Sequence, residues 1–180
     1  MQSTRPYLCN FIATVYPNSS RQELKSFFEG RPELSSQCLV KVRDQWQPQE
    51  SEHSLSFYVK ALRQSDLTLS PVGLNHECYR ILEAVEYGSV PVVEISPQQV
   101  ASSCDSGESS PLRLFHQLNA PFIYVSNWTQ ELPLILRSEG EMSAEEKVRR
   151  RVRLLKWYYK FKSILRSRLI SVVRQNFIVT

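Results

Sequence analysis

The sequence predicts an α/β domain with a Rossmann-like, doubly wound parallel sheet and a long C-terminal helical segment. Two observations favour this fold class. Short, continuous apolar runs alternate with helix-like stretches across residues 7–136, and strands covered by helices on both faces have such runs. From Ser143 to Phe177, apolar residues recur at helical spacing and predict one long helix or a broken pair. We therefore divide the chain into a Rossmann-like domain, residues 1–138, and a basic amphipathic helical segment, residues 139–180, that packs back on it.

The first predicted elements are two strands and two helices. Residues 7–16 are apolar and aromatic and predict a buried strand. A turn rich in Asn and Ser then offers N-caps for a helix over 21–29. A second short strand is predicted at 38–42, and a polar loop precedes a helix over 54–64.

The central unit is predicted as a strand at 67–70, a Pro/Gly turn, a helix over 76–87 and a strand at 90–95. Gly88 is expected to end the helix in a left-handed cap. The remaining elements are predicted as a loop, a short helix, a strand and another short helix at 102–110, 112–118, 122–125 and 129–136.

Charge is distributed unevenly along the 180 residues. Residues 143–174 hold 11 Lys/Arg and 2 Asp/Glu, a balance of +9, whereas the remainder balances at −5, which gives the net +4. We interpret the basic segment as a solvated helix face on an acidic body. A nucleic-acid partner is not expected, because the body has no basic patch interleaved with aromatics. No apolar run is long enough to span a membrane and no signal peptide is evident, so the chain is either cytosolic or a fragment with its targeting segment upstream.

The cysteines and the glycosylation triplets weakly favour a location of the chain in a secretory lumen. The even number of cysteines allows three disulfide pairings, and the sequence does not choose among them. Their spacing shows no metal-binding pattern, so no metal site is expected. N-glycosylation is predicted at Asn18 and Asn127, each in an Asn-x-Ser/Thr triplet. The four cysteines are Cys9, Cys38, Cys78 and Cys104.

Ser65 to Glu94 is the predicted binding unit. In a doubly wound sheet, ligands bind where strand carboxyl ends meet helix amino ends, and the turn from Ser70 and Pro71 to Gly73 is such a junction. Gly73 would allow a ligand to approach the backbone. Asn75 is predicted to cap the helix, whose free N–H groups and dipole favour a phosphate or diphosphate.

Charged side chains follow this turn at spacings that suit a nucleotide. Arg80 can offer a bidentate fork to a diphosphate, and Glu83, three residues on, suits a ribose diol. The alternative for these two is a surface ion pair. Glu94 ends the next strand near the presumed cleft. No Asp-x-Asp or Walker loop is present, so no metal-bridged diphosphate is expected.

These motifs resemble the donor-binding half of exostosin-like glycosyltransferases. The similarity lies in Pro71-x-Gly73, Arg80-x-x-Glu83-Ala84 and Gly88-x-x-Pro91-Val92-Val93. The segments RPYLCNF, YPNSSRQEL, DQWQPQE and APFIYVSNW extend it over nearly the whole chain. The resemblance implies that residues 1–138 are the nucleotide-sugar-binding domain of a GT-B transferase. Gly73 and Arg80 would then hold the diphosphate, and Glu83 the ribose.

Within that family, the resemblance extends to the member that transfers xylose from UDP-xylose to ribitol 5-phosphate on the O-mannosyl glycan of α-dystroglycan. It implies an inverting reaction with a β-xyloside product, a luminal Golgi location, and no cofactor beside the donor substrate. Expected partners are the UDP-sugar, the acceptor glycan and other O-mannosyl glycan enzymes. The membrane would be reached only through an N-terminal anchor outside this chain.

The general base is also expected to come from an N-terminal domain, so no catalytic residue is assigned and the chain alone is expected to be inactive. Two alternatives stay open. One is an exostosin-like transferase with another UDP-sugar, and the other is a non-catalytic, truncated binding module. Upstream sequence would separate them, because an anchor and a further domain favour the transferase.

Overall fold

The computed structural model describes residues 5–73, 75–95 and 111–177 and contains a five-stranded, wholly parallel sheet in the order β2-β1-β3-β4-β5. This is the flavodoxin-like order of doubly wound folds. It confirms the predicted α/β, Rossmann-like class. The strands are β1 (Tyr7–Thr14), β2 (Cys38–Arg43), β3 (Ser65–Ser70), β4 (Val90–Glu94) and β5 (Ile123–Val125).

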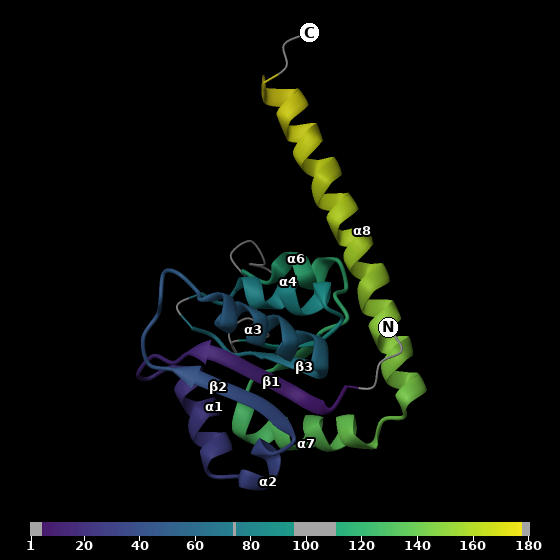
Figure 1. Ribbon diagram of the computed structural model, residues 1–180. Coiled ribbons are helices and arrows are strands. Elements are labelled where there is room, and N and C mark those ends of the chain that lie inside the picture. Colours follow the sequence, from purple (N-terminus) through teal and green to yellow (C-terminus); the bar gives the residue numbers. More distant parts are fainter. Residues whose placement is uncertain (1–4, 74, 96–110, 178–180) are drawn as a thin grey trace.

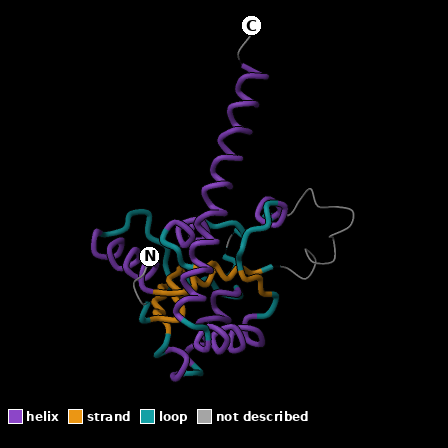
Figure 2. The backbone as a smooth tube through the Cα atoms, turned by 90° about the vertical axis from the view of Figure 1, so that its right-hand side faces the viewer, coloured by secondary structure: helices purple, strands orange, loops and turns teal. Residues whose placement is uncertain are grey.

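Helices cover both faces of the sheet (Figure 1). On one face lie α1 (Ser20–Glu29), the short α2 (Pro32–Ser35) and α7 (Trp128–Glu141). On the other lie α3 (Glu52–Gln64), α4 (Tyr79–Glu86) and α6 (Arg113–Gln117). The long α8 (Ala144–Phe177) passes the amino ends of the strands and projects beyond the body, as the tube view also shows (Figure 2). None of the described helices combines the length and the apolar character that crossing a membrane requires.

The chain leaves neighbouring strands toward opposite faces at one point of the sheet. β1 and β3 pair directly, with Cys9 opposite Leu67. β1 leads into α1 on one face, whereas β3 leads into α4 on the other. The carboxyl ends of β1 and β3 therefore form the topological switch point, where open α/β sheets bind ligands.

Both layers pack on a continuous apolar core. Phe11, Leu69 and Val92 from the strands are fully buried, as are Leu24 of α1 and Ile81 of α4. Strands buried on both faces explain why the apolar runs in the sequence are continuous and do not alternate.

Two helix ends follow the sequence signals closely. The Ser19 side chain accepts from the Gln22 backbone N–H and caps α1, as predicted. Gly88 follows α4 with φ +72°, and the N–H groups of Gly88 and Ser89 bond to the carbonyls of Val85 and Ala84. This Schellman pattern confirms the predicted left-handed cap.

Other boundaries differ from the prediction. α4 begins at Tyr79, so the assignment of Asn75 as its N-cap is wrong; Cys78 holds the cap position without a side-chain hydrogen bond. The preceding residues form bends, and helical bonding starts only with the Ile81 N–H to the Cys78 carbonyl. α7 continues five residues past the predicted end, to Glu141, because its inward face stays buried. The predicted loop at 102–110 lies outside the described residues, and the division of the chain near residue 138 remains a prediction.

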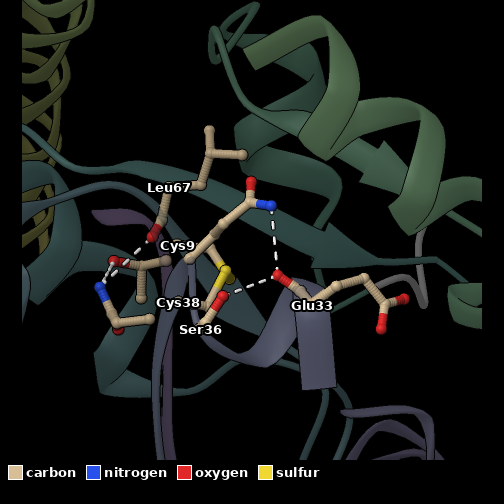
Figure 3. Close-up of a disulfide and its surroundings, with 8 residues drawn as sticks. Cys9, Glu33, Ser36, Cys38 and Leu67 are labelled. Atoms are coloured by element: carbon tan, nitrogen blue, oxygen red, sulfur yellow. Dashed lines mark hydrogen bonds between the residues drawn. A yellow bond between two sulfur atoms is a disulfide. The ribbon is translucent and has the colours of Figure 1, made fainter. Parts of the chain in front are cut away.

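A disulfide ties the edge strand β2 to β1. Cys9 and Cys38 are paired in register with 4.6 Å between their Cα atoms, and their sulfurs are bonded. Figure 3 shows the bond beside the turn where the Ser36 hydroxyl donates to the Glu33 carbonyl oxygen at 2.9 Å. Cys78 is a free thiol. The structure thus contains the Cys9–Cys38 bond, but with Cys78 free it realises none of the three two-bond pairings that four cysteines allow.

Candidate functional site

Two arginines reach the switch point from opposite helical layers. Arg21 lies in the first turn of α1 and Arg80 in the first turn of α4. Arg21 Nη1 donates to the Thr14 carbonyl oxygen at 2.9 Å, and Arg80 Nη2 donates to the Ile12 carbonyl oxygen at 2.9 Å. Both guanidinium groups are therefore anchored on the carboxyl end of β1.

These two positive charges are partly buried, and no carboxylate among the described residues forms an ion pair with either. Burial lowers the pKa of Arg21, and the nearby charge of Arg80 lowers it further. The Nε atoms of Arg21 and Arg80 are buried, and neither has a hydrogen-bond partner among the described residues. Such an arrangement favours an anion with several acceptor oxygens.

Gly73 allows Arg21 to lie directly over the loop between β3 and α4. A Cβ atom at this glycine would lie 2.4 Å from Cζ and from Nη2 of Arg21. Position 73 therefore requires glycine because the Arg21 side chain packs closely against it. A ligand that approaches the backbone would be a second reason.

Gly73→Ala should weaken anion binding at the switch point, because the new methyl group would push the Arg21 guanidinium off the loop. We expect UDP affinity to fall about fivefold and the free energy of unfolding to fall by about 1 kcal/mol. Calorimetric titration and urea unfolding measure the two effects. Gly30→Ala is the matched control, because its Cβ would meet no atom closer than 3.5 Å. Unchanged affinity in Gly73→Ala would contradict the role given to Arg21.

The Glu94 carboxylate joins four parts of this edge. It accepts from Ser20 Oγ at 2.6 Å, from the Val72 backbone N–H at 2.8 Å and from Trp128 Nε1 at 2.9 Å. These donors belong to α1, the loop after β3 and the start of α7, while Glu94 ends β4. The contacts indicate that Glu94 positions the loop carrying Gly73. Direct contact with a donor sugar stays a prediction.

Glu83 lies on the α3 side of the site. Its Oε2 accepts from the Tyr58 hydroxyl at 2.6 Å. Burial raises the pKa of Tyr58, and the bond to Glu83 raises it further, so the hydroxyl remains a donor near neutral pH. Within the described part of the chain Oε1 takes no hydrogen bond, which leaves one carboxylate oxygen for a ligand hydroxyl.

The structure thus brings some, but not all, of the predicted site residues together. Ser70 ends β3 with its hydroxyl buried and unpartnered among the described residues, and Pro71 beside it is buried. Together with Gly73, Arg80 and Glu94 they form the carboxyl edge of the central strands. Asn75 is exposed and has lost its predicted capping role.

Sequence reasoning missed four side chains of this region: Ser20, Arg21, Tyr58 and Trp128. A signal existed for Arg21, which directly follows the capping serines of the helix after β1. In a doubly wound sheet that helix start flanks the same switch point as α4. If the strand order β2-β1-β3 had been recognised from the sequence, it would have identified Arg21 as a candidate site residue.

The remaining predicted sites are placed as follows. Asn18 lies in an exposed turn at φ +56°, and the Asn127 side chain caps α7 by accepting from the Gln130 N–H at 3.0 Å. Glycosylation at both stays a prediction. In the described part of the chain, no group of three or more His, Cys, Asp or Glu side chains could hold a metal ion.

Comparison with known proteins gives a consistent result. Residues 1–178 match the family model described as RXYLT1 C-terminal domain. The chain is 47% identical over 179 residues to ribitol-5-phosphate xylosyltransferase 1 of Danio rerio, covering 98% of this chain. It is 45% identical to the proteins of the same name from Homo sapiens and Mus musculus, covering 99% of this chain in each case. The chain spans 40% of the length of each relative.

Proposed function

Because the chain belongs to the RXYLT1 C-terminal domain family, we propose that it is the donor-binding part of a xylosyltransferase that uses UDP-xylose. The proposed acceptor is ribitol 5-phosphate on the O-mannosyl glycan of α-dystroglycan. The relatives' names support xylose transfer to ribitol 5-phosphate. The observation that carries the nucleotide assignment is the presence, at the switch point, of two arginines that form no ion pair within the described residues.

The diphosphate of the donor is assigned to Arg21 and Arg80. A diphosphate offers acceptor oxygens on two phosphorus atoms, so each guanidinium can bind one phosphate. The buried Nε atoms would then gain the acceptors that they lack within the described residues. Each arginine is already fixed by a backbone carbonyl, so little side-chain entropy would be lost on binding.

The ribose is assigned to Glu83. A carboxylate oxygen can accept from both hydroxyls of a diol, and Oε2 is held in place by Tyr58. The bond to Tyr58 limits the rotation of the carboxylate and would orient its other oxygen.

The reaction proposed is an inverting transfer from an α-linked donor that yields a β-xyloside. As the bond to the sugar breaks, negative charge develops on the leaving UDP, and Arg21 and Arg80 would stabilise that charge without a metal. A general base must remove the proton of the acceptor hydroxyl. We place this base outside the chain, in the 60% of the relatives' length that the chain does not span.

A Golgi lumen is the proposed location. The Cys9–Cys38 disulfide supports this, since such bonds persist in oxidising compartments. Other enzymes that build the O-mannosyl glycan remain proposed partners.

Titration of UDP into wild type and Glu83→Ala tests the nucleotide assignment. Wild type should bind UDP and UDP-xylose, and Glu83→Ala should bind UDP about ten- to a hundredfold more weakly, the value of one hydrogen bond to a charged group. Tyr58→Phe is the comparison: it retains the carboxylate and loses only the bond that orients it, so it should weaken UDP binding less than Glu83→Ala does. Equal affinity of wild type and Glu83→Ala would remove Glu83 from the ribose site.

The sugar is tested separately, by comparing UDP-xylose with UDP-glucose and UDP-galactose. Xylose lacks the hydroxymethyl group of the hexoses, so a site shaped for it should bind UDP-xylose most tightly. Tighter binding of a hexose donor would favour another exostosin-like transferase. Absence of binding by all UDP-sugars would favour a non-catalytic module.

A further inference from the structure

One large aromatic side chain at the carboxyl edge of the sheet lies outside the packed core. Trp46 is 64% exposed and belongs to the loop between β2 and α3. Among the described residues, no hydrogen bond, ring contact or cation contact includes its indole. The other two tryptophans are buried or half-buried, and the indole N–H groups of Trp128 and Trp157 donate to protein oxygens at 2.9 and 2.7 Å. An exposed, unpartnered indole is typical of a binding surface.

We propose that Trp46 stacks on the uracil base of the nucleotide-sugar donor. The inference rests on the proposed function, in which Arg21 and Arg80 bind the diphosphate and Glu83 binds the ribose. The residues that bind those two parts of the nucleotide are charged. A base also has a flat π-face, for which an aromatic side chain is the usual protein surface. Trp46 supplies that surface for the third part of the nucleotide.

The loop that carries Trp46 begins beside the diphosphate site. Arg43 is the last residue of β2 and lies opposite Thr14, and its Nε donates to Thr14 Oγ1 at 3.1 Å. The carbonyl oxygen of Thr14 is the acceptor that anchors Arg21. Trp46 follows Arg43 by three residues, which span at most about 11 Å. This short connection keeps the indole near a ligand that Arg21 holds.

The same loop ends at the helix that positions the ribose carboxylate. The Ser51 side chain caps α3 by accepting from the Ser54 backbone N–H at 3.1 Å, and Tyr58 of α3 donates to Glu83. In Figure 1 the chain runs from the end of β2 around the carboxyl edge to α3. Trp46 thus lies on the connection from the diphosphate side to the ribose side. In UDP-xylose the base is joined to the ribose and the xylose to the far phosphate, so the base is the part that this loop would meet.

A buttress at its two ends gives the loop a fixed shape. Arg43 Nη2 lies 2.6 Å from Glu50 Oε1, and Ser54 Oγ donates to Glu50 Oε2 at 2.6 Å. The hydrogen bonds from Arg43 and Ser54 lower the pKa of Glu50, so its carboxylate stays charged at neutral pH. Residues 45–49 are therefore closed into a lobe that presents Trp46 to solvent. A loop that is ordered before binding loses little entropy when the base arrives.

Calorimetric titration of UDP and of inorganic pyrophosphate separates the base from the diphosphate. Trp46→Ala should bind UDP about five- to 150-fold more weakly than wild type, the effect of losing one stack between a base and an aromatic ring. It should bind pyrophosphate with wild-type affinity. Trp46→Phe retains a flat ring and should keep most of the UDP affinity. Tyr159→Ala is the matched control, because Tyr159 is 68% exposed but lies in α8, away from the carboxyl edge.

Fluorescence gives a second readout of the same contact. UDP should quench the emission of wild type more strongly than that of Trp46→Phe, because a stacked base touches the indole. Pyrophosphate should quench both proteins equally. Quenching of Trp46 by ribitol 5-phosphate, with none by UDP, would place the indole at the acceptor and overturn the inference.

The titrations also distinguish this inference from the proposed function. Wild-type UDP affinity in Trp46→Ala, together with weakened binding in Arg80→Ala, would overturn the stacking role and leave the diphosphate assignment intact. Equal losses of UDP and pyrophosphate affinity in Trp46→Ala would mean that the loop acts through the arginines, which also overturns stacking. Absence of UDP binding by wild type would overturn both.

Discussion

Arg80→Ala is expected to lower the affinity of the chain for UDP by about ten- to a hundredfold, the effect of losing one or two charge-assisted hydrogen bonds. Arg21→Ala should have a similar effect, because both guanidinium groups lie at the carboxyl end of β1. The double variant should show no measurable binding. Isothermal titration with UDP, at constant and low salt, gives the affinities.

The charge and the shape of the guanidinium can be separated. Arg80→Lys retains the positive charge and loses the planar fork, so it should recover only part of the affinity. Arg137→Ala is the matched control, since this exposed arginine of α7 lies away from the switch point in a groove beside Pro133 and Gly140. Full UDP affinity in Arg21→Ala and Arg80→Ala would refute the diphosphate assignment.

The free thiol beside Arg80 provides an independent readout. Arg80 Nη1 lies 3.8 Å from Cys78 Sγ, and Cys78 is free. A diphosphate bound to Arg80 should cover this sulfur. UDP should therefore slow alkylation of the Cys78 peptide by iodoacetamide in wild type but not in Arg80→Ala, as followed by mass spectrometry. Alkylation at the same rate with and without UDP at saturating concentration would place the nucleotide elsewhere.

Local signals in the sequence were sufficient for most of the fold. The Ser19 cap and the Gly88 turn depend on residues within five positions of each other, and both were predicted. The error at Asn75 has the same origin: asparagine is a good cap in isolation, but the chain bends through Cys78 before α4 begins. A propensity does not reveal where the packing of a helix allows it to start.

The site was less predictable, because its contacts join distant segments. Arg21 covers Gly73, which lies 52 positions later in the chain, and Trp128 donates to Glu94 from 34 positions away. Position within a motif identified Arg80 as a candidate, yet it did not reveal that Arg21 lies near it at the carboxyl end of β1. Nor did it distinguish residues that face a ligand from residues that hold the binding loop, and Glu94 is the clearest example.

Glu94→Ala should lower the free energy of unfolding by about 3 kcal/mol, because it leaves three hydrogen-bond donors without their acceptor. Those donors are Ser20 Oγ, the Val72 N–H and Trp128 Nε1. Urea unfolding followed by circular dichroism measures the loss. Glu94→Gln retains one acceptor oxygen and the shape of the side chain, and should lose about 1 kcal/mol.

The same variants separate a positioning role from direct contact with the donor. If Glu94 positions the loop, Glu94→Ala should lose stability and UDP affinity together, since Val72 and Gly73 lose their anchor on β4. Glu94→Gln should then recover most of both. Glu83→Ala is the comparison: its exposed carboxylate should matter for UDP and change stability by less than about 1 kcal/mol. Wild-type stability of Glu94→Ala with UDP binding abolished would instead mean that Glu94 touches the nucleotide-sugar itself. The ligand would then bind to Oε1, which accepts from Ser20 alone among the described residues and keeps a second lone pair.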